Sequence, residues 1–304
     1  MSKSKIYDCI MGVAVGDAFG FPYQFLPRDT YKVSPNMKAL SKEFPAGSWS
    51  DDTAMTLATM ESLSIMGRVD ISDIMLNFSL WFSEGMFTPF GFAYDIGRGT
   101  AMSIRNYIRG ADVTECGLRG KEDNGNGSLM RILPLAFSNA TLDDIAAVSS
   151  LTHGHELAIH ACQIQVAVAR KLLKGFEISE ALRSVMAEYP YCTYEEYSNL
   201  ATIGSRTRDE IRSTGFVKDT IEAAMWCLLN SSSYRECILL AARLGWDTDS
   251  VGAVAGGLAG IIYGSTGLKG IPPKWIKALQ AREFVEELIT QFEENCDFGN
   301  ILQK

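Results

Sequence analysis

The sequence predicts an all-α protein folded as one domain. Apolar residues recur at helical spacing along almost the whole chain, and the alternating apolar and polar pattern of a half-buried strand is nearly absent. The 304 residues include 47% hydrophobic residues, which is enough to bury a large core as one domain or two. Because no linker, low-complexity tract or clean repeat divides the chain, we expect a single domain over residues 1–304.

Ten segments carry the helical pattern, and local start signals support several of them. Thr141 followed by Asp144 resembles a capping box, and Pro272 with Pro273 suits a first helical turn. The predicted helices cover residues 4–19, 53–66, 72–83, 141–151, 155–174, 179–187, 219–229, 234–244, 250–263 and 273–294. Long irregular loops are expected at 20–50, 84–130 and 189–218, and loops of that length commonly serve a site or are mobile.

Two of these helices carry glycine at every fourth position. One stripe consists of Gly12, Gly16 and Gly20, and the other of Gly252, Gly256, Gly260 and Gly264. Glycine costs about 1 kcal/mol relative to alanine in a helix interior. Close packing of one helix backbone on another offsets that cost, so we expect the two stripes to face each other at the centre of the bundle. The alternative is that glycine only loosens these helices.

Charge and hydropathy exclude several classes of partner. The net charge of −8 and the isoelectric point near 5.1 disfavour binding to a phosphate backbone, so we expect no nucleic-acid partner. The longest apolar run, residues 251–263, is too short and too rich in glycine to span a membrane, and no signal peptide is visible. The seven cysteines form no CxxC pair, which is typical of reduced, mostly buried thiols in a cytoplasmic protein.

Two acidic clusters carry most of the functional information. Ser50-Asp51-Asp52 and Asp247-Thr248-Asp249-Ser250 lie 195 residues apart, so no local element explains both. Two carboxylates about 4 Å apart repel by roughly 4 kcal/mol at an effective dielectric near 20, and cations would neutralise such a group. Oxygen ligands select Mg²⁺ or Mn²⁺ rather than zinc, which predicts a two-metal site. Alternatively, each cluster is only a helix N-cap, where hydroxyl and carboxylate side chains are common.

Three further segments could contribute to a site. The glycine-rich loop from Asn124 to Arg131 could cradle phosphates with its backbone amides, although it lacks the lysine of a P-loop and could be a turn. Asp95 lies in a loop rich in glycine and aromatic residues, as a catalytic carboxylate or a turn former. His153 could donate to a phosphate or ribose, or could be a capping or core histidine.

The histidine cluster does not fit a helical zinc site. All three histidines lie between positions 153 and 160, and His155 is followed by a glutamate. Zinc on a helix needs the second histidine four positions after the first, whereas position 159 is isoleucine and the next histidine is His160. The sequence therefore favours oxygen-ligated ions over zinc.

Taken together, these segments resemble the ADP-ribosylglycohydrolase family, which includes the dinitrogenase-reductase-activating glycohydrolases and the ADP-ribosylarginine hydrolases. The resemblance rests on five stretches in the family's order, residues 12–20, 49–55, 124–134, 151–153 and 245–253, which extend over most of the chain. Each motif alone is modest, but five in sequence are specific. The resemblance implies a single compact orthogonal helical bundle with a central metal-binding cleft.

The resemblance also implies roles for individual residues. One Mg²⁺ or Mn²⁺ would be held by Ser50, Asp51 and Asp52, and a second by Asp247, Asp249 and Ser250. ADP-ribose would be bound by Asn124, Gly125, Asn126, Gly127, Ser128, Met130 and His153. The catalytic residues would be Asp95, Asp51 and Asp249.

The activity that follows is hydrolysis of the N-glycosidic bond between ADP-ribose and an acceptor. The expected acceptor is an arginine of a modified protein, so that the enzyme reverses mono-ADP-ribosylation, and a small-molecule ADP-ribose conjugate is the other possible substrate. Two alternatives stay open: hydrolysis of another ADP-ribose linkage, such as serine or O-acetyl-ADP-ribose, and a catalytically inactive ADP-ribose binder. The sequence does not determine the oligomeric state.

Three positions depart from the family pattern. Gln24 stands where some relatives carry a metal-associated glutamate, which places more weight on Asp95 as the proton-handling group. Trp246 replaces the usual second glycine before the Asp-Thr-Asp motif and could narrow the cleft or stack against a ring of the substrate. Ser250 replaces the commoner threonine and keeps the hydroxyl.

Overall fold

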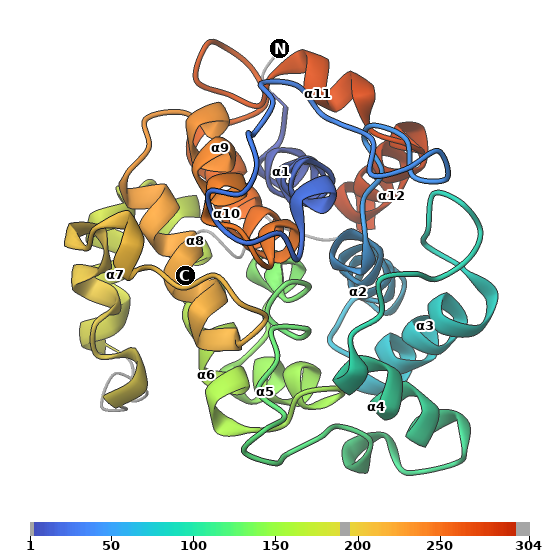
Figure 1. The fold of residues 1–304 in the computed structure, drawn as a ribbon. Coiled ribbons are helices and arrows are strands. Elements are labelled where there is room, and N and C mark those ends of the chain that lie inside the picture. Colours follow the sequence, from blue (N-terminus) through green and yellow to red (C-terminus); the bar gives the residue numbers. More distant parts are fainter. Residues whose placement is uncertain (1–2, 189–194, 296–304) are drawn as a thin grey trace.

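Helices supply all the regular secondary structure of the computed structural model, which describes residues 3–188 and 195–295 (Figure 1). Within these ranges no β-strand forms, and only two isolated β-bridges are present, Leu118 with His153 and Gly125 with Phe216. The α-helices are α1 (Lys5–Gly20), α2 (Asp51–Met66), α3 (Ile71–Glu84), α4 (Arg98–Ile108), α5 (Leu142–Ser150), α6 (Glu156–Leu173), α7 (Ile178–Glu188), α8 (Val217–Leu229), α9 (Tyr234–Leu244), α10 (Thr248–Tyr263), α11 (Pro273–Ala278) and α12 (Arg282–Asn295). The prediction of an all-α helical bundle is confirmed, while the metal content of its cleft stays a prediction.

Short 3₁₀ turns interrupt the loops between these helices. They are η1 (Phe21–Tyr23), η2 (Val113–Glu115), η3 (Leu133–Phe137), η5 (Glu195–Tyr197), η6 (Leu200–Ser205) and η7 (Arg208–Glu210). The predicted loop at 20–50 is irregular apart from η1. Six residues of the predicted loop at 189–218 lie outside the described ranges, and its remaining part contains η5, η6 and η7.

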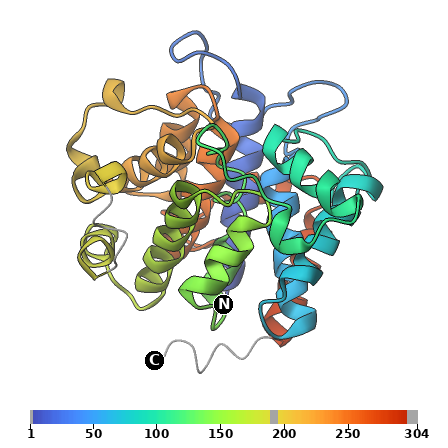
Figure 2. The same cartoon turned by 90° about the horizontal axis from the view of Figure 1, so that it is seen from below.

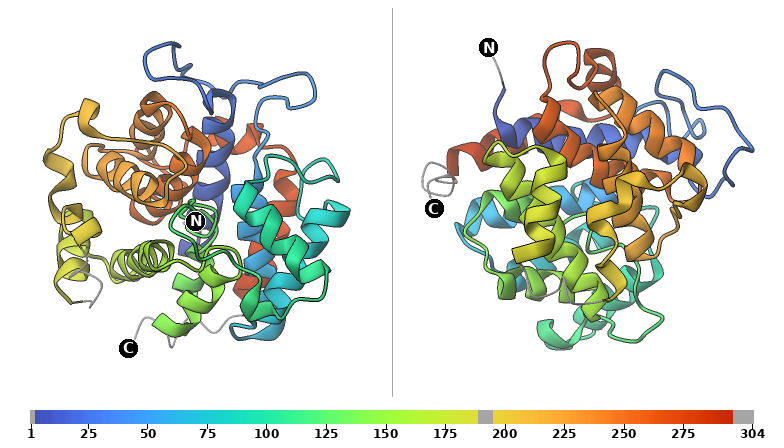
Figure 3. Two further views of the ribbon diagram at one scale, coloured as in Figure 1. Left: turned by 60° about the horizontal axis from the view of Figure 1, so that its bottom comes forward. Right: turned by 90° about the vertical axis from the view of Figure 1, so that its left-hand side faces the viewer.

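Helices α1 and α10 lie against each other at the centre of the molecule (Figures 1 and 3). The glycine stripes make this contact in antiparallel order, with Gly12 opposite Gly256 and Gly16 opposite Gly252. A β-carbon built on Gly16 would overlap the carbonyl of Gly252, and one built on Gly252 would overlap the carbonyl of Gly16. The prediction that the stripes face each other is therefore confirmed, because no larger residue fits at this backbone separation.

The other helices pack around this central pair. Helices α8 and α9 contact α10 on one side, and α2 and α12 contact α1 on the other. Figures 2 and 3 show α1 between the orange helices and the blue-to-teal helices. Helix α3 packs on α2, α4 packs on α3, and α5 and α6 form a neighbouring pair. The N-termini of α2 and α10 thereby come close together, although their sequences are far apart.

Two predictions about elements were wrong. Helix α4 forms inside the segment predicted as an irregular loop at 84–130. The sequence missed it because the segment is polar overall and its buried face, Thr100, Ala101, Ser103 and Ile104, has only one large apolar residue. The single helix predicted at 273–294 is split into α11 and α12. Ala281 has a positive φ of 48° at the break, and Gln280 there donates from its backbone N–H to Gly47 and accepts from the Trp49 indole.

Several local predictions are confirmed. Thr141 and Asp144 form a reciprocal capping box at the start of α5, and Pro273 is the first residue of α11. The five described cysteines are free and buried, whereas Cys192 and Cys296 lie outside the described residues. None of the helices in the described ranges has both the length and the apolar character needed to cross a membrane.

Candidate active site

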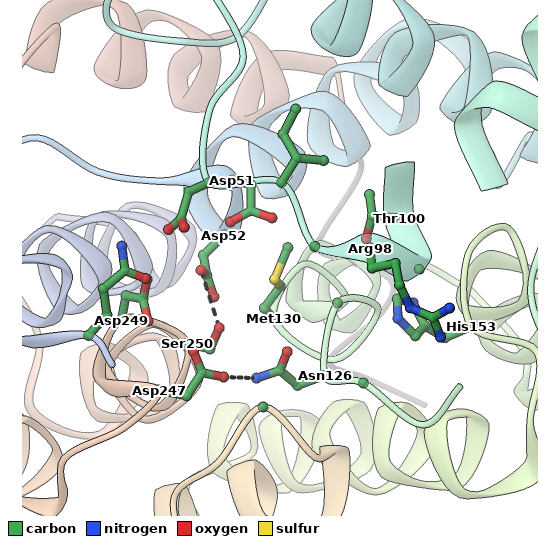
Figure 4. A pocket seen from close by; sticks show the side chains of 18 of the residues that line it. Asp51, Asp52, Arg98, Thr100, Asn126, Met130, His153, Asp247, Asp249 and Ser250 are labelled. Carbon is green, nitrogen blue, oxygen red and sulfur yellow. Dashed lines mark hydrogen bonds between the residues drawn. The ribbon is translucent and has the colours of Figure 1, made fainter. Parts of the chain in front are cut away.

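A pocket of about 380 Å³ opens where the N-termini of α2 and α10 meet the start of α4 with the loop before it, at residues 95–100, and the loop at 122–130 (Figure 4). Eleven of the predicted site residues line it: Asp51, Asp52, Asp95, Gly125, Asn126, Gly127, Met130, His153, Asp247, Asp249 and Ser250. Three others are buried behind its wall. Ser50 donates to Asp52, Asn124 donates to the carbonyl of Lys121, and Ser128 accepts from Ser149. The pocket therefore brings together segments from both halves of the chain.

The two acidic clusters form one end of this pocket. Ser50 caps α2 by accepting from the backbone N–H of Asp52, and its hydroxyl lies 2.9 Å from the Oδ2 atom of the same residue. Ser250, in the first turn of α10, donates to that oxygen across 3.3 Å and so links the clusters. Both helices direct their positive ends at the carboxylates. Ser50 is therefore also a helix N-cap, as the alternative interpretation of the cluster predicted. Capping alone does not explain why the two clusters lie together.

The environment of the acidic end disfavours the ionised form of its carboxyl groups. Burial, followed by the charges of neighbouring aspartates, raises the pKa of Asp51, Asp52 and Asp249 well above the ordinary value. The Oδ1 atoms of Asp52 and Asp249 are buried with no hydrogen-bond partner among the described residues. Buried polar atoms are normally paired, so these two oxygens are available to a ligand that the protein itself does not supply.

The oxygen ligands at the acidic end suit divalent cations, but their side chains are not arranged as a preformed metal site. In the described part of the chain, no three acidic, histidine or cysteine side chains form a group that could already hold a metal ion. The carboxylates nevertheless line one pocket, and two of their oxygens are unpaired. The donor set suits a divalent cation, because rotation about a carboxylate's side-chain torsions requires little energy compared with leaving its oxygen unpaired.

Asp17 holds the acidic end together, and sequence reasoning did not assign it a role. It lies in the buried helix α1 and accepts from the backbone N–H groups of Ser50 and Thr53 at 2.9 and 3.0 Å. The Thr53 hydroxyl donates to it at 2.6 Å. Burial raises the pKa of Asp17 to about 6, and these hydrogen bonds oppose the rise. A charged residue inside an otherwise apolar, glycine-striped segment was the available signal.

Asp95 stands beside the acidic end in a constrained backbone conformation. Its φ of 57° lies in the left-handed region, and its side chain is half-buried in the pocket wall. Burial raises the pKa of Asp95, and hydrogen bonding with Asp249 and Gln24 opposes the rise. Gln24 also lines the pocket, so the departure from the family pattern at this position lies within the site.

Trp246 directly precedes Asp247 of the acidic end but is not among the residues that line the pocket. It too has a positive φ, and it exchanges backbone hydrogen bonds with the segment after η1, donating to Leu26 at 2.9 Å and accepting from Phe25. The side chains of Trp246 and Phe25 are 46% and 68% exposed, which is unusual for large aromatic residues. Of the two, Phe25 lines the pocket.

The opposite end of the pocket, called the neutral end below, carries the uncharged ring of His153 and an ion pair in which Arg98 lies 3.0 Å from Asp123. The exposed Glu122 also lines the pocket. Met130 separates the carboxylates from His153, Arg98 and Thr100 (Figure 4). Between the ends, Asn126 donates its side-chain amide to Asp247 at 2.5 Å and to Thr220 at 2.9 Å. Burial, and then the charge of Arg131, lowers the pKa of His153 to about 3, so its ring is neutral. Of the other two histidines, His155 is the N-cap of α6 and His160 lies within that helix.

The fold and the site define an all-α protein with a pocket that has buried carboxylates at one end. Comparison with known families identifies the protein further. The model of the family described as ADP-ribosylglycohydrolase matches residues 2–298. The chain therefore belongs to the ADP-ribosylglycohydrolase family, and it is a hydrolase that acts on glycosidic bonds of ADP-ribose. The resemblance inferred from five sequence motifs is thereby confirmed.

Individual relatives agree with this assignment. The ADP-ribosylarginine hydrolase Tri1 of Pseudomonas putida is 33% identical over 291 residues, which cover 92% of this chain and 75% of the relative. The ADP-ribosyl-[dinitrogen reductase] glycohydrolase of Rhodospirillum rubrum is 26% identical over 93% of this chain and 94% of its own. A solved structure described as an ADP-ribosylglycohydrolase-related protein complex superimposes with a TM-score of 0.79 at 30% identity, covering 95% and 97% of the two chains.

Proposed function

We propose that this protein hydrolyses the N-glycosidic bond between ADP-ribose and an arginine of a modified protein, and so reverses mono-ADP-ribosylation. The main support is one observation: four carboxylates from two distant segments line the same pocket as the glycine-rich loop and His153. Similarity to an ADP-ribosylarginine hydrolase supports arginine as the acceptor. Because the family model extends over residues 2–298 and α1 packs against α10, we also propose that the chain forms one domain.

We further propose that two divalent cations, Mg²⁺ or Mn²⁺, belong at the acidic end. Ser50, Asp51 and Asp52 would hold one, and Asp247, Asp249 and Ser250 the other, with Asp249 as a candidate bridge. The unpaired oxygens of Asp52 and Asp249 support this assignment, and hard cations prefer such ligands. When bound, ions of this kind orient hydroxyl groups and lower the pKa of a bound water.

The chain's own residues supply orientation and proton transfer. Asp95 would orient or deprotonate the attacking water, or assist the leaving guanidine, because its carboxyl group lies in the pocket wall in contact with Asp249. The loop of Gly125, Asn126 and Gly127 would accept the diphosphate close to its backbone, since glycine adds no side chain there. Holding ADP-ribose along the pocket would fix its anomeric carbon beside Asp95.

The decisive experiment is incubation with ADP-ribosylated arginine in the presence of Mg²⁺ or Mn²⁺, with and without a chelator. We expect free ADP-ribose and unmodified arginine as products, and no product with the chelator. Parallel reactions with ADP-ribosyl-serine and O-acetyl-ADP-ribose measure the preference among linkages. Faster turnover of either would replace arginine as the acceptor, and binding of ADP-ribose without any turnover would identify an inactive binder.

A further inference from the structure

Arg131 is completely buried beneath the neutral end of the pocket, in a setting that needs an explanation. Its guanidinium lies 4.4 Å from the centre of the Phe78 ring and donates to the Thr152 hydroxyl at 2.9 Å and to the carbonyl of Val148 at 3.2 Å. Its Nε and Nη1 atoms have no hydrogen-bond partner among the described residues. Burying a cation is costly, so a role for Arg131 is expected beyond packing.

Hydrogen-bond directions follow from the chemistry of the three groups. A guanidinium can only donate, so Thr152 Oγ1 accepts from Arg131. The same oxygen lies 2.9 Å from Nδ1 of His153. If Nδ1 carried the proton and donated to this oxygen, the Thr152 hydroxyl proton would have no acceptor among the described residues, so we assign Thr152 as the donor to Nδ1. A neutral imidazole carries one proton, which must then lie on Nε2.

The Nε2 atom faces a space that glycine residues keep open. A β-carbon at Gly99 or Gly125 would lie 3.0 or 3.2 Å from Nε2, and one at Gly127 would lie 2.7 Å from the adjacent Cε1. His153 and these three glycines all line the pocket. A neutral N–H donor in a glycine-walled recess is suited to a phosphate or hydroxyl oxygen, whereas a bare nitrogen there would repel it.

We infer that Arg131 and Thr152 are positioning residues that lock His153 in its Nε2–H tautomer, so that the neutral ring donates a hydrogen bond to an oxygen of bound ADP-ribose. The inference rests on the proposed function for the identity of the ligand. Neither residue reaches the ligand itself. The buried charge of Arg131 fixes the direction of the Thr152 hydroxyl and disfavours a cationic ring, and Thr152 transmits that constraint to His153.

The tautomer can be measured directly by ¹⁵N NMR of the imidazole rings in the full chain, which has only three histidines. His153→Gln assigns the signals by deletion. We expect the wild type and Thr152→Ser to show a protonated Nε2 and a bare Nδ1, and Thr152→Val to lose this fixed pattern. A protonated Nδ1 in the wild type, or an unchanged pattern in Thr152→Val, would overturn the inference.

Calorimetric titration with ADP-ribose tests the consequence for binding. Thr152→Val should weaken binding about tenfold, as expected for loss of one well-directed hydrogen bond to a charged group, while Thr152→Ser should stay close to the wild type. His153→Gln, whose amide can donate from a similar position, should bind more tightly than His153→Leu. Thr59→Val, a buried substitution farther along α2, serves as the matched control.

The two proposals fail in different ways. If the wild type binds no ADP-ribose, the proposed function is contradicted, and the ring signals still decide the tautomer. If the wild type binds ADP-ribose and Thr152→Val binds equally well, the positioning role is contradicted while the proposed function stands. Should Thr152→Val not fold, the wild-type ring signals and the comparison of His153→Gln with His153→Leu decide the question alone.

Discussion

The two ends of the pocket differ in the charge they bury and in how the protein pairs their polar groups. At the acidic end, carboxylates from the starts of α2 and α10 are buried together, and two of their oxygens lack any partner among the described residues. At the neutral end, His153 is held through Thr152 by a cation buried behind it. The first end leaves buried carboxylate oxygens unpaired, whereas the second holds its histidine ring in place with a hydrogen bond from the protein itself. This difference shows that one pocket can combine carboxylates that repel one another with a ring that the protein already positions.

The largest expected effect comes from removing one charge at the acidic end. Asp249→Asn should abolish metal binding and reduce turnover by about 10²- to 10³-fold, because a neutral amide is a poor ligand for a hard dication. The protein should stay folded, since the change relieves repulsion within the cluster. Metal analysis with a turnover assay checks this, and the exposed Asp143→Asn in α5 is the matched control. Wild-type turnover with stoichiometric metal would contradict the ligand assignment.

A second substitution separates metal binding from proton transfer. Asp95→Asn should keep the metals but slow the release of ADP-ribose by about 10²-fold or more, the range for loss of a general acid or base. Asparagine tolerates the positive φ at this position, so the backbone should not change. Asp29→Asn, at another positive φ but on the exposed surface, is the control. A normal rate in Asp95→Asn would assign the base elsewhere.

At the neutral end, adding a single methyl group should weaken the binding of ADP-ribose and leave the binding of metal ions unchanged. A β-carbon at Gly127 would lie 2.7 Å from Cε1 of His153 and 2.9 Å from the Thr100 hydroxyl, so Gly127→Ala should displace the ring. We expect about tenfold weaker binding of ADP-ribose, equivalent to roughly 1.4 kcal/mol, with metal stoichiometry unchanged. Gly97→Ala, where the nearest such atom is 3.9 Å away, should have a smaller effect. Loss of metal in Gly127→Ala would show that the two ends are not separable.

The smallest effect is a dependence of stability on pH in the metal-free protein. The folded-state pKa values of Asp51, Asp52 and Asp249 lie above the ordinary value, and that of Asp17 is raised to about 6. The folded chain therefore binds more protons than the unfolded chain between the two sets of pKa values, so the free energy of unfolding falls as pH rises through this window. The melting temperature should fall by about 2 °C for each kcal/mol lost in a chain of this size.

Thermal unfolding with a chelator at about pH 5.5 and about pH 8 measures this slope, and Mg²⁺ should remove it. Asp249→Asn should flatten the slope, because it has one fewer group with a raised pKa. A metal-free protein that becomes more stable with rising pH over this window would contradict the assignment of strained carboxylates to the acidic end.

The sequence by itself determined the all-α class, most helix boundaries and the family. Helical periodicity and capping signals are local, so α9 could be predicted to the residue and the capping box at Thr141 could be recognised without tertiary information. The glycine stripes of α1 and α10 also identified their own contact, because only close backbone packing offsets the cost of glycine in a helix. Ten of the residues lining the pocket were recoverable because they lie within the five family motifs, whereas others, such as Phe25, Thr100 and Gly215, lie outside them and were not assigned to the site.

Tertiary structure decided what depends on contacts between distant segments. Asp17 accepts hydrogen bonds from the start of α2, and Gln24 contacts Asp95. Gln280 pairs with Gly47 and so divides the last predicted helix into two. In each case the partner is remote in sequence, so the contact is not encoded locally. The same is true of the chain from Arg131 through Thr152 to His153. A hydrogen bond has a direction only once both partners are placed, so local sequence patterns can identify these residues but not the protonation and orientation that the fold imposes on them.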